Sequence, residues 1–361
     1  MALLQVEEYA AAARALLAED VWGFIEGGSG AEATLAANRA AYERVLLRPR
    51  VLVDVSRCAT GITLLGAPMT MPVGIAPMAY HRLVHPDGEL ATAAAAGEAG
   101  VLLVVSMFSS ATIEEVATAA AGPLWMQVYW LRRRDVVADV VGRAEAAGIG
   151  ALVLTVDAPR VARRLRDARA GFALPPHARA VNVDPAVMAT SHGAEAGSSA
   201  VQRHSLEQFD PSITWADLPW LRERTALPLV LKGILTAEDA RRSVDAGVDA
   251  IVVSNHGGRQ LDGAVPSLDA LPEVVAAVPD SVPVLVDGGV RSGTDVFRAL
   301  ALGARAVLVG RPVLWGLAHS GAAGAAAVLR LLRDELEECM ALAGRPALAD
   351  IDPSAVRVSP R

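Results

Sequence analysis

The sequence predicts an α/β fold, a (β/α)8 TIM barrel with an N-terminal helical extension and a long loop after the fourth strand. Eight short apolar runs without polar alternation are expected of parallel strands covered on both faces. Helical patterns lie between them, several beginning with a Thr or Ser that can cap a helix. After three of these patterns a glycine, Gly148, Gly247 or Gly303, can close the helix, and an Ala three positions later opens the next run.

The expected strands occupy the chain between Pro72 and Arg311. Consecutive strand-helix units in this number predict a closed barrel. An open doubly wound sheet is the alternative, but it requires a GxGxxG turn after an early strand, and none follows one in this sequence. The expected strands are residues 72–76, 101–106, 124–129, 151–156, 228–232, 250–254, 282–287 and 306–310.

The flanking segments complete a single domain over residues 1–361. Residues 1–71 are expected to form helices and a hairpin before the barrel, which spans 72–318. Residues 319–361 are expected to form a helix, packed against the barrel or a neighbouring subunit, and a tail. The loop 172–213, after the fourth strand, is too long and too polar for a plain connection, which predicts a mobile lid over an active site.

Composition argues against several classes of protein. The formal net charge of -7 would repel a nucleic-acid backbone. Cys58 and Cys339 have no Cys or His at ligand spacing, so we expect no disulfide framework and no metal site, and we expect a cytoplasmic location. Glu7 and Glu8 stand where a signal peptide needs basic and apolar residues, and we expect no membrane-spanning segment.

Polar residues interrupt the apolar strands almost always at their C-terminal ends. In a barrel these ends meet at one mouth, so residues far apart in the sequence become neighbours. A single Ser or Thr in such a place is most simply a satisfied strand-end group, but seven strands sharing the pattern predict a functional site. The residues are Ser106, Gln127, Tyr129, Thr155, Asp157, Lys232, Ser254, His256, Asp287 and Arg311.

Two glycine-containing segments predict a phosphate site. Asp287 begins the segment DGGVRSG after the seventh strand, and Gly310 begins GRP after the eighth. Barrels bind phosphate with backbone N–H groups at these two loops, and Arg291 and Arg311 add two guanidinium groups. Ordinary turn chemistry is the alternative for either segment alone.

The segment around His256 carries the most specific chemistry. A histidine at a strand exit can act as a base near neutral pH, and Arg259, three residues later, can bind a carboxylate with two hydrogen bonds. Their spacing suits a two-point grip on a 2-hydroxy acid. The alternative is a helix-capping His and a surface Arg.

The segments SNHGGRQLD (254–262), VDGGVRSGTD (286–295) and VGRP (309–312) resemble the FMN-dependent 2-hydroxy acid oxidase family, which includes glycolate oxidases, lactate oxidases and mandelate dehydrogenases. The resemblance covers nearly the whole chain and extends through LTVDAPR (154–160) and LKGILTAEDA (231–240). It implies FMN as the cofactor and oxidation of an (S)-2-hydroxy acid to the 2-oxo acid. A homotetramer or homo-octamer is usual in the family.

The resemblance also implies roles for individual residues. His256 would take a proton from the substrate, with Asp157 orienting its ring. Arg259 and Arg164 would bind the substrate carboxylate, Tyr129 would bind the hydroxyl or carboxylate region, and Lys232 would lie beside the pyrimidine edge of the flavin. The residues expected to bind the cofactor are Pro77, Met78, Ala79, Ser106, Gln127, Thr155, Lys232, Ser254, Asp287, Gly288, Gly289, Arg291, Gly310 and Arg311.

One departure from the family pattern concerns the substrate. Glycolate oxidases of the family carry a tyrosine where this chain has Phe24. Loss of that hydroxyl leaves an apolar wall, which with Met107 and Phe108 after the second strand predicts a pocket for an aryl substituent, as in mandelate or 4-hydroxymandelate. Ala79 is also expected to contact the substrate. In these features the chain is most similar to the 4-hydroxymandelate oxidases of the family.

The electron acceptor and the alternatives complete the hypothesis. Membrane-bound mandelate dehydrogenases of the family carry an apolar insertion after the fourth strand, whereas residues 175–213 here are mixed and polar. The resemblance therefore implies a soluble oxidase that reduces O2 to H2O2. A glycolate- or lactate-type oxidase and a mandelate dehydrogenase with a quinone acceptor are the alternatives within the family. Outside it stand a barrel aldolase that forms a Schiff base at Lys232, and a barrel that only binds a ligand. His81 and His85 are expected in loops or at the surface, as are the arginines 160, 163, 166 and 169.

Overall fold

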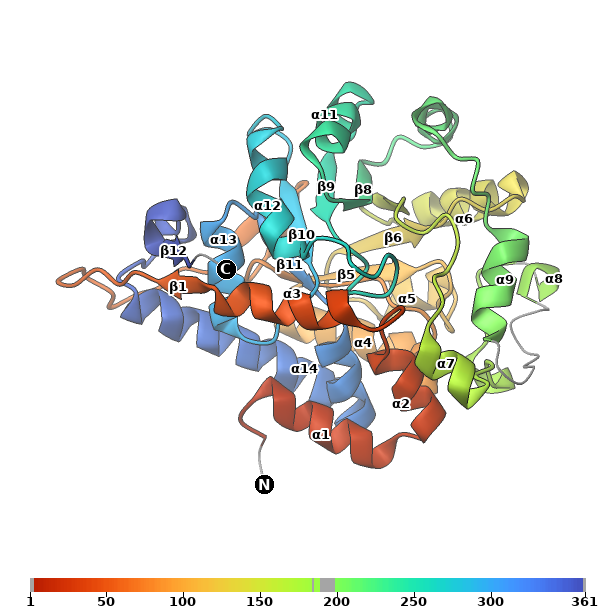
Figure 1. Ribbon diagram of the computed structural model, residues 1–361, viewed down its shortest axis with the longest axis horizontal. Coiled ribbons are helices and arrows are strands. Elements are labelled where there is room, and N and C mark those ends of the chain that lie inside the picture. Colours follow the sequence, from red (N-terminus) through yellow and green to blue (C-terminus); the bar gives the residue numbers. More distant parts are fainter. Residues whose placement is uncertain (1–2, 184, 189–198, 360–361) are drawn as a thin grey trace.

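The chain forms a closed eight-stranded barrel surrounded by helices (Figure 1). The structure, a computed structural model, describes residues 3–183, 185–188 and 199–359. Each of the eight expected strands forms, so the fold predicted from the sequence is confirmed. The barrel strands are β4 (Val73–Ile75), β5 (Leu102–Ser106), β6 (Leu124–Val128), β7 (Leu152–Thr155), β8 (Leu229–Ile234), β9 (Ala250–Val253), β10 (Val284–Asp287) and β11 (Ala306–Val309).

All neighbouring barrel strands are parallel, and the barrel closes where β11 pairs with β4, with Val307 opposite Val73. Almost every residue in these strands is buried, because side chains alternate between the barrel interior and the surrounding helices. The one register shift lies in β8, between Lys232 and Ile234. Gly233 has a φ of +116°, and a Cβ there would lie 2.6 Å from the Cβ of Asp157, so only glycine lets these neighbouring strand ends approach so closely.

The surrounding helices begin at the polar caps that the sequence indicates. Thr112 and Glu115 form a capping box at α5, and Thr236 and Ser292 each accept a backbone hydrogen bond at the start of α11 and α13. These caps satisfy amide groups that the first helical turn leaves without partners. The helices around the barrel are α4 (Gly88–Ala99), α5 (Ile113–Ala119), α6 (Arg134–Ala146), α10 (Leu218–Arg222), α11 (Ala237–Asp245), α12 (Ser267–Ala276), α13 (Gly293–Ala301) and α14 (Arg311–Leu342).

The N-terminal extension contains the predicted helices and hairpin. Its helices are α1 (Val6–Leu16), α2 (Glu19–Glu26) and α3 (Ala33–Glu43), and its hairpin pairs β2 (Ile62–Leu64) with β3 (Ala67–Met69). The strand β1 (Val45–Leu47) pairs antiparallel with β12 (Val356–Val358), which ties the extension to the C-terminal tail. The end of α2 lies at the mouth of the barrel, where Phe24 and Ile25 reach the cavity described below.

The helix α14 is the longest in the described part of the chain. Its backbone leaves helical geometry at Ser320 and Gly321, so two helical segments meet at a kink. By length and composition alone it could cross a membrane, but 67% of its most apolar window is buried inside the protein. It packs against α1, α4 and α13, so its apolar character serves the core (Figure 1).

The insertion after β7 carries α7 (Leu165–Ala170), α8 (Pro185–Met188) and α9 (Ala200–Gln208). Helix α9 lies outside the barrel, and Val201, His204 and Ser205 from it line the cavity at the barrel mouth (Figure 1). The insertion therefore contributes side chains to the site. The prediction that it is a mobile lid falls partly on residues 184 and 189–198, which lie outside the described residues, and it stays a prediction.

Candidate active site

A cavity of about 1350 Å³, open mouth included, lies at the C-terminal ends of the barrel strands. Eighteen residues predicted from the sequence line it. These residues come from the ends of barrel strands, from the loops that follow them and from α2. Their side chains meet at one mouth of the barrel, as the sequence predicts. These residues are Phe24, Pro77, Met78, Ala79, Ser106, Phe108, Tyr129, Thr155, Arg164, Lys232, His256, Arg259, Asp287, Gly288, Gly289, Arg291, Gly310 and Arg311.

Three predicted residues lie behind this wall and hold the lining side chains. Asp157 contacts His256, and the hydroxyl of Ser254 accepts a hydrogen bond from Lys232. Gln127 donates to Thr155 at 3.1 Å and accepts from the hydroxyl of Ser106 at 3.3 Å. Direct contact of Gln127 and Ser254 with a cofactor stays a prediction.

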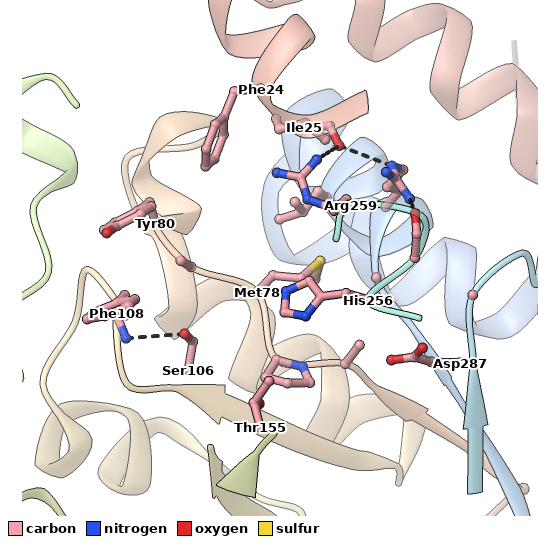
Figure 2. Close-up of a pocket in the computed structure, with 18 of the residues that line it drawn as sticks. Phe24, Ile25, Met78, Tyr80, Ser106, Phe108, Thr155, His256, Arg259 and Asp287 are labelled. Atoms are coloured by element: carbon pink, nitrogen blue, oxygen red, sulfur yellow. Dashed lines mark hydrogen bonds between the residues drawn. The ribbon is translucent and has the colours of Figure 1, made fainter. Parts of the chain in front are cut away.

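The imidazole of His256 projects into the middle of the cavity (Figure 2). Its backbone is in the left-handed region, with a φ of +59°, which is strained for a residue with a Cβ and is typical of functional sites. The hydroxyl of Ser254 accepts a hydrogen bond from its backbone N–H at 3.0 Å and helps to hold this conformation. Nδ1 lies 2.8 Å from Oδ1 of Asp157, so Nε2 is the nitrogen through which the ring can accept a proton from a ligand.

Asp157 is placed to stabilise a cationic His256. Burial alone would raise the pKa of this carboxyl, but the attraction of His256 and Lys232 outweighs burial and keeps the pKa below its ordinary value. Gln260 donates to the backbone carbonyls of Asp157 and Arg160 and so fixes the loop that follows β7. His256 is therefore a candidate base, and its partner Asp157 is fixed in position and ionised.

Two arginines lie together in the cavity beside Phe24, Arg164 buried and Arg259 partly buried. Arg259 donates to the carbonyl oxygens of Ile25 and Gly27, at 3.1 and 2.6 Å, and its guanidinium lies 5.4 Å from the centre of the Phe24 ring. Arg164 lies 5.9 Å from the same ring, with Asp167 4.0 Å away. Burial lowers the pKa of both arginines, and the repulsion of Arg164 lowers that of Arg259 further. Such a pair gains stability when a carboxylate binds.

A second pair of arginines lies beside the loops after β10 and β11. Arg311 donates to the carbonyl oxygens of Ile25 and Gly257, and Arg291 lies 4.7 Å from the ring centre of Trp315. Burial lowers the pKa of both, and burial with the repulsion of Arg311 brings the pKa of Arg291 to about 10. Gly289 lies against α3 with a φ of +97°, and a Cβ there would lie 2.5 Å from the carbonyl oxygen of Asn38. The arrangement suits a phosphate group.

Lys232 lies deep in the cavity and is held by two partners. Its Nζ lies 2.8 Å from a carboxylate oxygen of Asp287 and donates to the hydroxyl of Ser254 at 2.7 Å. Burial lowers the pKa of Lys232, but the attraction of Asp287 and Asp157 more than reverses this, so the pKa lies above its ordinary value. Formation of a Schiff base needs a neutral amine, so the ammonium ion held here speaks against the barrel aldolase.

Aromatic rings form the remaining wall of the cavity. Phe24 stacks on Phe172 with ring centres 4.4 Å apart, and Phe108 stacks on Tyr129 at 5.4 Å. Tyr80 stacks on Phe108 at 6.3 Å. The expectation of an apolar wall at Phe24 and Phe108 is therefore met, and the wall extends further than the sequence predicted.

Sequence reasoning missed several lining residues and misplaced one histidine. Tyr80, His204 and Phe209 line the cavity although no motif marks them. Tyr80 directly follows the predicted residue Ala79, which could have identified it. His81 was expected in a loop or at the surface, but it is only 2% exposed, and its Nδ1 lies 2.8 Å from the hydroxyl of Thr92. The short helix after Tyr80 turns its side chain inward, and burial lowers its pKa.

Comparisons with known proteins agree with this geometry. A family model described as FMN-dependent dehydrogenase matches residues 13–358. The chain is 51% identical over 344 residues to the 4-hydroxymandelate oxidase of Amycolatopsis orientalis, covering 95% of each sequence. It is 49% identical over 351 residues to the L-lactate oxidase of a Nostoc species, covering 96% of each. A crystal structure of mandelate oxidase with (S)-4-hydroxymandelic acid superimposes with a TM-score of 0.95 at 48% identity, over 99% of both chains.

Proposed function

The chain belongs to the FMN-dependent dehydrogenase family, and from this premise we propose that it oxidises an aryl (S)-2-hydroxy acid, such as mandelate or 4-hydroxymandelate, with O2 as the electron acceptor. The substrate gives up two electrons and two protons to become the 2-oxo acid, and O2 takes them up to become H2O2. Membership of the family identifies the enzyme as an FMN-dependent oxidase of 2-hydroxy acids. The shape of the cavity supports an aryl substituent on that acid.

The residues of the cavity fit FMN. Arg291 and Arg311 are buried cations that repel each other, so a phosphate dianion would relieve their repulsion. The missing side chain at Gly289 lets the loop after β10 lie against α3 beside these two arginines. Asp287 would bind the ribityl chain, and Ser106, Thr155 and Lys232 would bind the ring system. When bound, FMN accepts the two electrons that leave the substrate.

The protein side chains position the substrate and move its proton. Arg259 and Arg164 bind the carboxylate, which places the hydroxyl-bearing carbon beside His256 and Tyr129. His256 takes a proton from the substrate through Nε2, and Asp157 stabilises the imidazolium that results. Burial raises the pKa of Tyr129, so its hydroxyl stays protonated and can donate a hydrogen bond to the substrate.

The aromatic wall is the observation that carries the aryl proposal. A hydroxy acid with a methyl or hydrogen substituent would leave the part of the cavity lined by Phe24, Tyr80 and Phe108 unfilled, whereas an aromatic ring can pack against these side chains. The name of a relative that is 51% identical points to the same substrate class.

A substrate panel tests this function. The purified protein should be yellow and should release FMN on denaturation. Under aerobic conditions mandelate and 4-hydroxymandelate should produce H2O2 with a kcat/KM at least about tenfold above that of lactate or glycolate. Higher turnover of lactate or glycolate would indicate the small-substrate alternative, and turnover only with an added quinone would indicate a dehydrogenase.

We also propose a cytoplasmic homotetramer or homo-octamer without nucleic-acid or membrane partners. The free thiols of Cys58 and Cys339 and the net charge of -7 support the location and the lack of nucleic-acid binding. Light scattering of the purified protein measures the subunit number, and a monomeric mass would contradict the proposal.

A further inference from the structure

We propose that Asp167 is a built-in counter-ion of the carboxylate site, which halves the net positive charge that Arg164 and Arg259 present to the substrate and so allows the 2-oxo acid product to leave. The inference rests on the binding of the substrate carboxylate by these two arginines, proposed above. Asp167 does not itself line the cavity and acts on the substrate only through the charge that it adds beside them.

Asp167 is buried directly behind the carboxylate site. It lies in the first turn of α7, which packs against α2 at the barrel mouth (Figure 1). Its side chain is only 1% exposed, and its Oδ2 lies 4.0 Å from Nη1 of Arg164. This separation is too long for a hydrogen bond, so the two charges attract each other without being joined.

Both members of this ion pair have unused hydrogen-bonding atoms. Oδ1 of Asp167 and Nε of Arg164 have no hydrogen-bond partner among the residues that the structure describes. A buried ion pair that served only to hold the fold would be expected to make hydrogen bonds at these atoms, because an unpaired buried polar atom costs stability. Arg164 therefore keeps donor capacity for a second anion, and the cavity that it lines provides the place for one.

The charges around this site balance when one carboxylate binds. Burial raises the pKa of the Asp167 carboxyl, and the attraction of Arg164 and Arg259 opposes that rise. Asp167 in turn opposes the lowering by burial of the pKa of both arginines. Glu26 and Arg311 also act on Arg259, but with opposite signs. Two arginines and one aspartate thus leave one net positive charge, which a monoanionic acid neutralises.

This net charge determines how tightly an acid is held. Without the charge of Asp167, the carboxylate would meet two uncompensated cations in a site largely shielded from water, where electrostatic attraction is strong. The substrate and its 2-oxo acid product carry the same carboxylate, so the stronger attraction would hold both of them. Asp167 therefore weakens acid binding to a level at which the product can dissociate.

The test measures the Kd of phenylacetate, an unreactive acid, for the FMN-loaded protein by calorimetry in wild type and in Asp167→Asn. The titrations are made at pH 8, about four units above the ordinary pKa of an aspartate, so that the wild-type carboxyl is ionised. The substitution should lower this Kd by at least about tenfold, and that of phenylglyoxylate, the 2-oxo acid formed from mandelate, by a similar factor. The Kd of phenylacetamide, which has nearly the same shape but no charge, should stay within about threefold.

Asp139→Asn is the matched control, because Asp139 pairs with Arg143 at 3.7 Å on the exposed face of α6. This change should leave each Kd within about twofold of wild type. Asp167→Ser, a smaller neutral replacement, should tighten acid binding in the same way and serves if Asp167→Asn does not retain FMN. Flavin absorbance and the thermal midpoint show that each variant is folded.

Three results would overturn the role of Asp167. They are a Kd of phenylacetate that is unchanged or higher in the neutral variants, an equal tightening of phenylacetamide, and loss of FMN from both variants, which would make the carboxylate a part of the fold alone. Failure of the wild-type protein to bind phenylacetate would instead overturn the proposed carboxylate site, and this inference with it.

Discussion

Nδ1 of His256 lies 2.8 Å from Oδ1 of Asp157, although 99 residues separate the two in the sequence. The contact forms because β7 and β9 both pair with β8, and because Gly233 in β8 has no side chain to hold Asp157 away. It fixes the ring so that Nε2 is the nitrogen free to take the substrate proton in the mechanism we propose. That mechanism therefore depends on a residue that does not line the cavity.

Asp157→Asn should slow the reaction without releasing the cofactor. The amide cannot compensate a positive charge on His256, and we expect flavin reduction by 4-hydroxymandelate to slow by at least about 100-fold. Anaerobic stopped-flow absorbance measures this rate. A variant that keeps its FMN and reduces it within about threefold of the wild-type rate would refute the role of Asp157.

Asp157→Asn should also make the free energy of unfolding less sensitive to low pH. The folded-state pKa of Asp157 is lower than its ordinary value, so its ionised form stabilises the fold. This contribution is present above the unfolded pKa of about 3.9 and is lost as the pH falls through the folded pKa. The difference in free energy of unfolding between wild type and Asp157→Asn, measured by urea titration from pH 6 to pH 3.5, should shrink toward the acid end. A difference that grows there would contradict the pKa direction.

Gly289→Ala should weaken both FMN binding and the fold. Its Cβ would lie 2.5 Å from the carbonyl oxygen of Asn38, so α3 or the phosphate loop must shift, and we expect a loss of about 2 kcal/mol in stability. Gly142→Ala is the control, because Gly142 lies within α6 with no atom near its Cβ position and should gain about 0.5 kcal/mol. Thermal unfolding measures the stability of each variant, and its FMN content measures cofactor binding. Equal effects of the two changes would refute this account of the loop.

Arg259→Leu should affect the substrate far more than the cofactor. Removing one of the two cations at the proposed carboxylate site should raise the Kd of phenylacetate, an unreactive acid, by at least about 30-fold while FMN content stays near that of wild type. Arg160→Ala, a change at an exposed arginine, should leave both quantities within twofold. Loss of FMN from Arg259→Leu with little change in acid binding would assign Arg259 to the cofactor site.

The barrel and its mouth could be predicted from the sequence because both arise from local patterns. Apolar runs such as residues 250–254 mark buried strands, and several polar residues at the ends of such runs, among them Lys232 and Asp287, line the cavity at the mouth. The pairing of Val45 with Val358 could not be predicted, since it joins two short strands at opposite ends of the chain and no local pattern links them.

The aromatic wall was only partly predictable for a related reason. His204 and Phe209 come from an insertion without strand or motif periodicity, so nothing in the sequence says that α9 and the residue after it turn these side chains toward the cavity. His81 was misplaced because a polar residue beside a turn suggests exposure, whereas Thr92 and the packing of α4 bury it. Contacts between distant elements decide these positions.

The most direct test of the account is anaerobic flavin reduction by 4-hydroxymandelate in wild type and His256→Ala. We expect the wild-type flavin absorbance to bleach rapidly, and the variant, with FMN still bound, to bleach at least about 1000-fold more slowly because no base takes the substrate proton. Bleaching of the variant within tenfold of the wild-type rate would contradict the account.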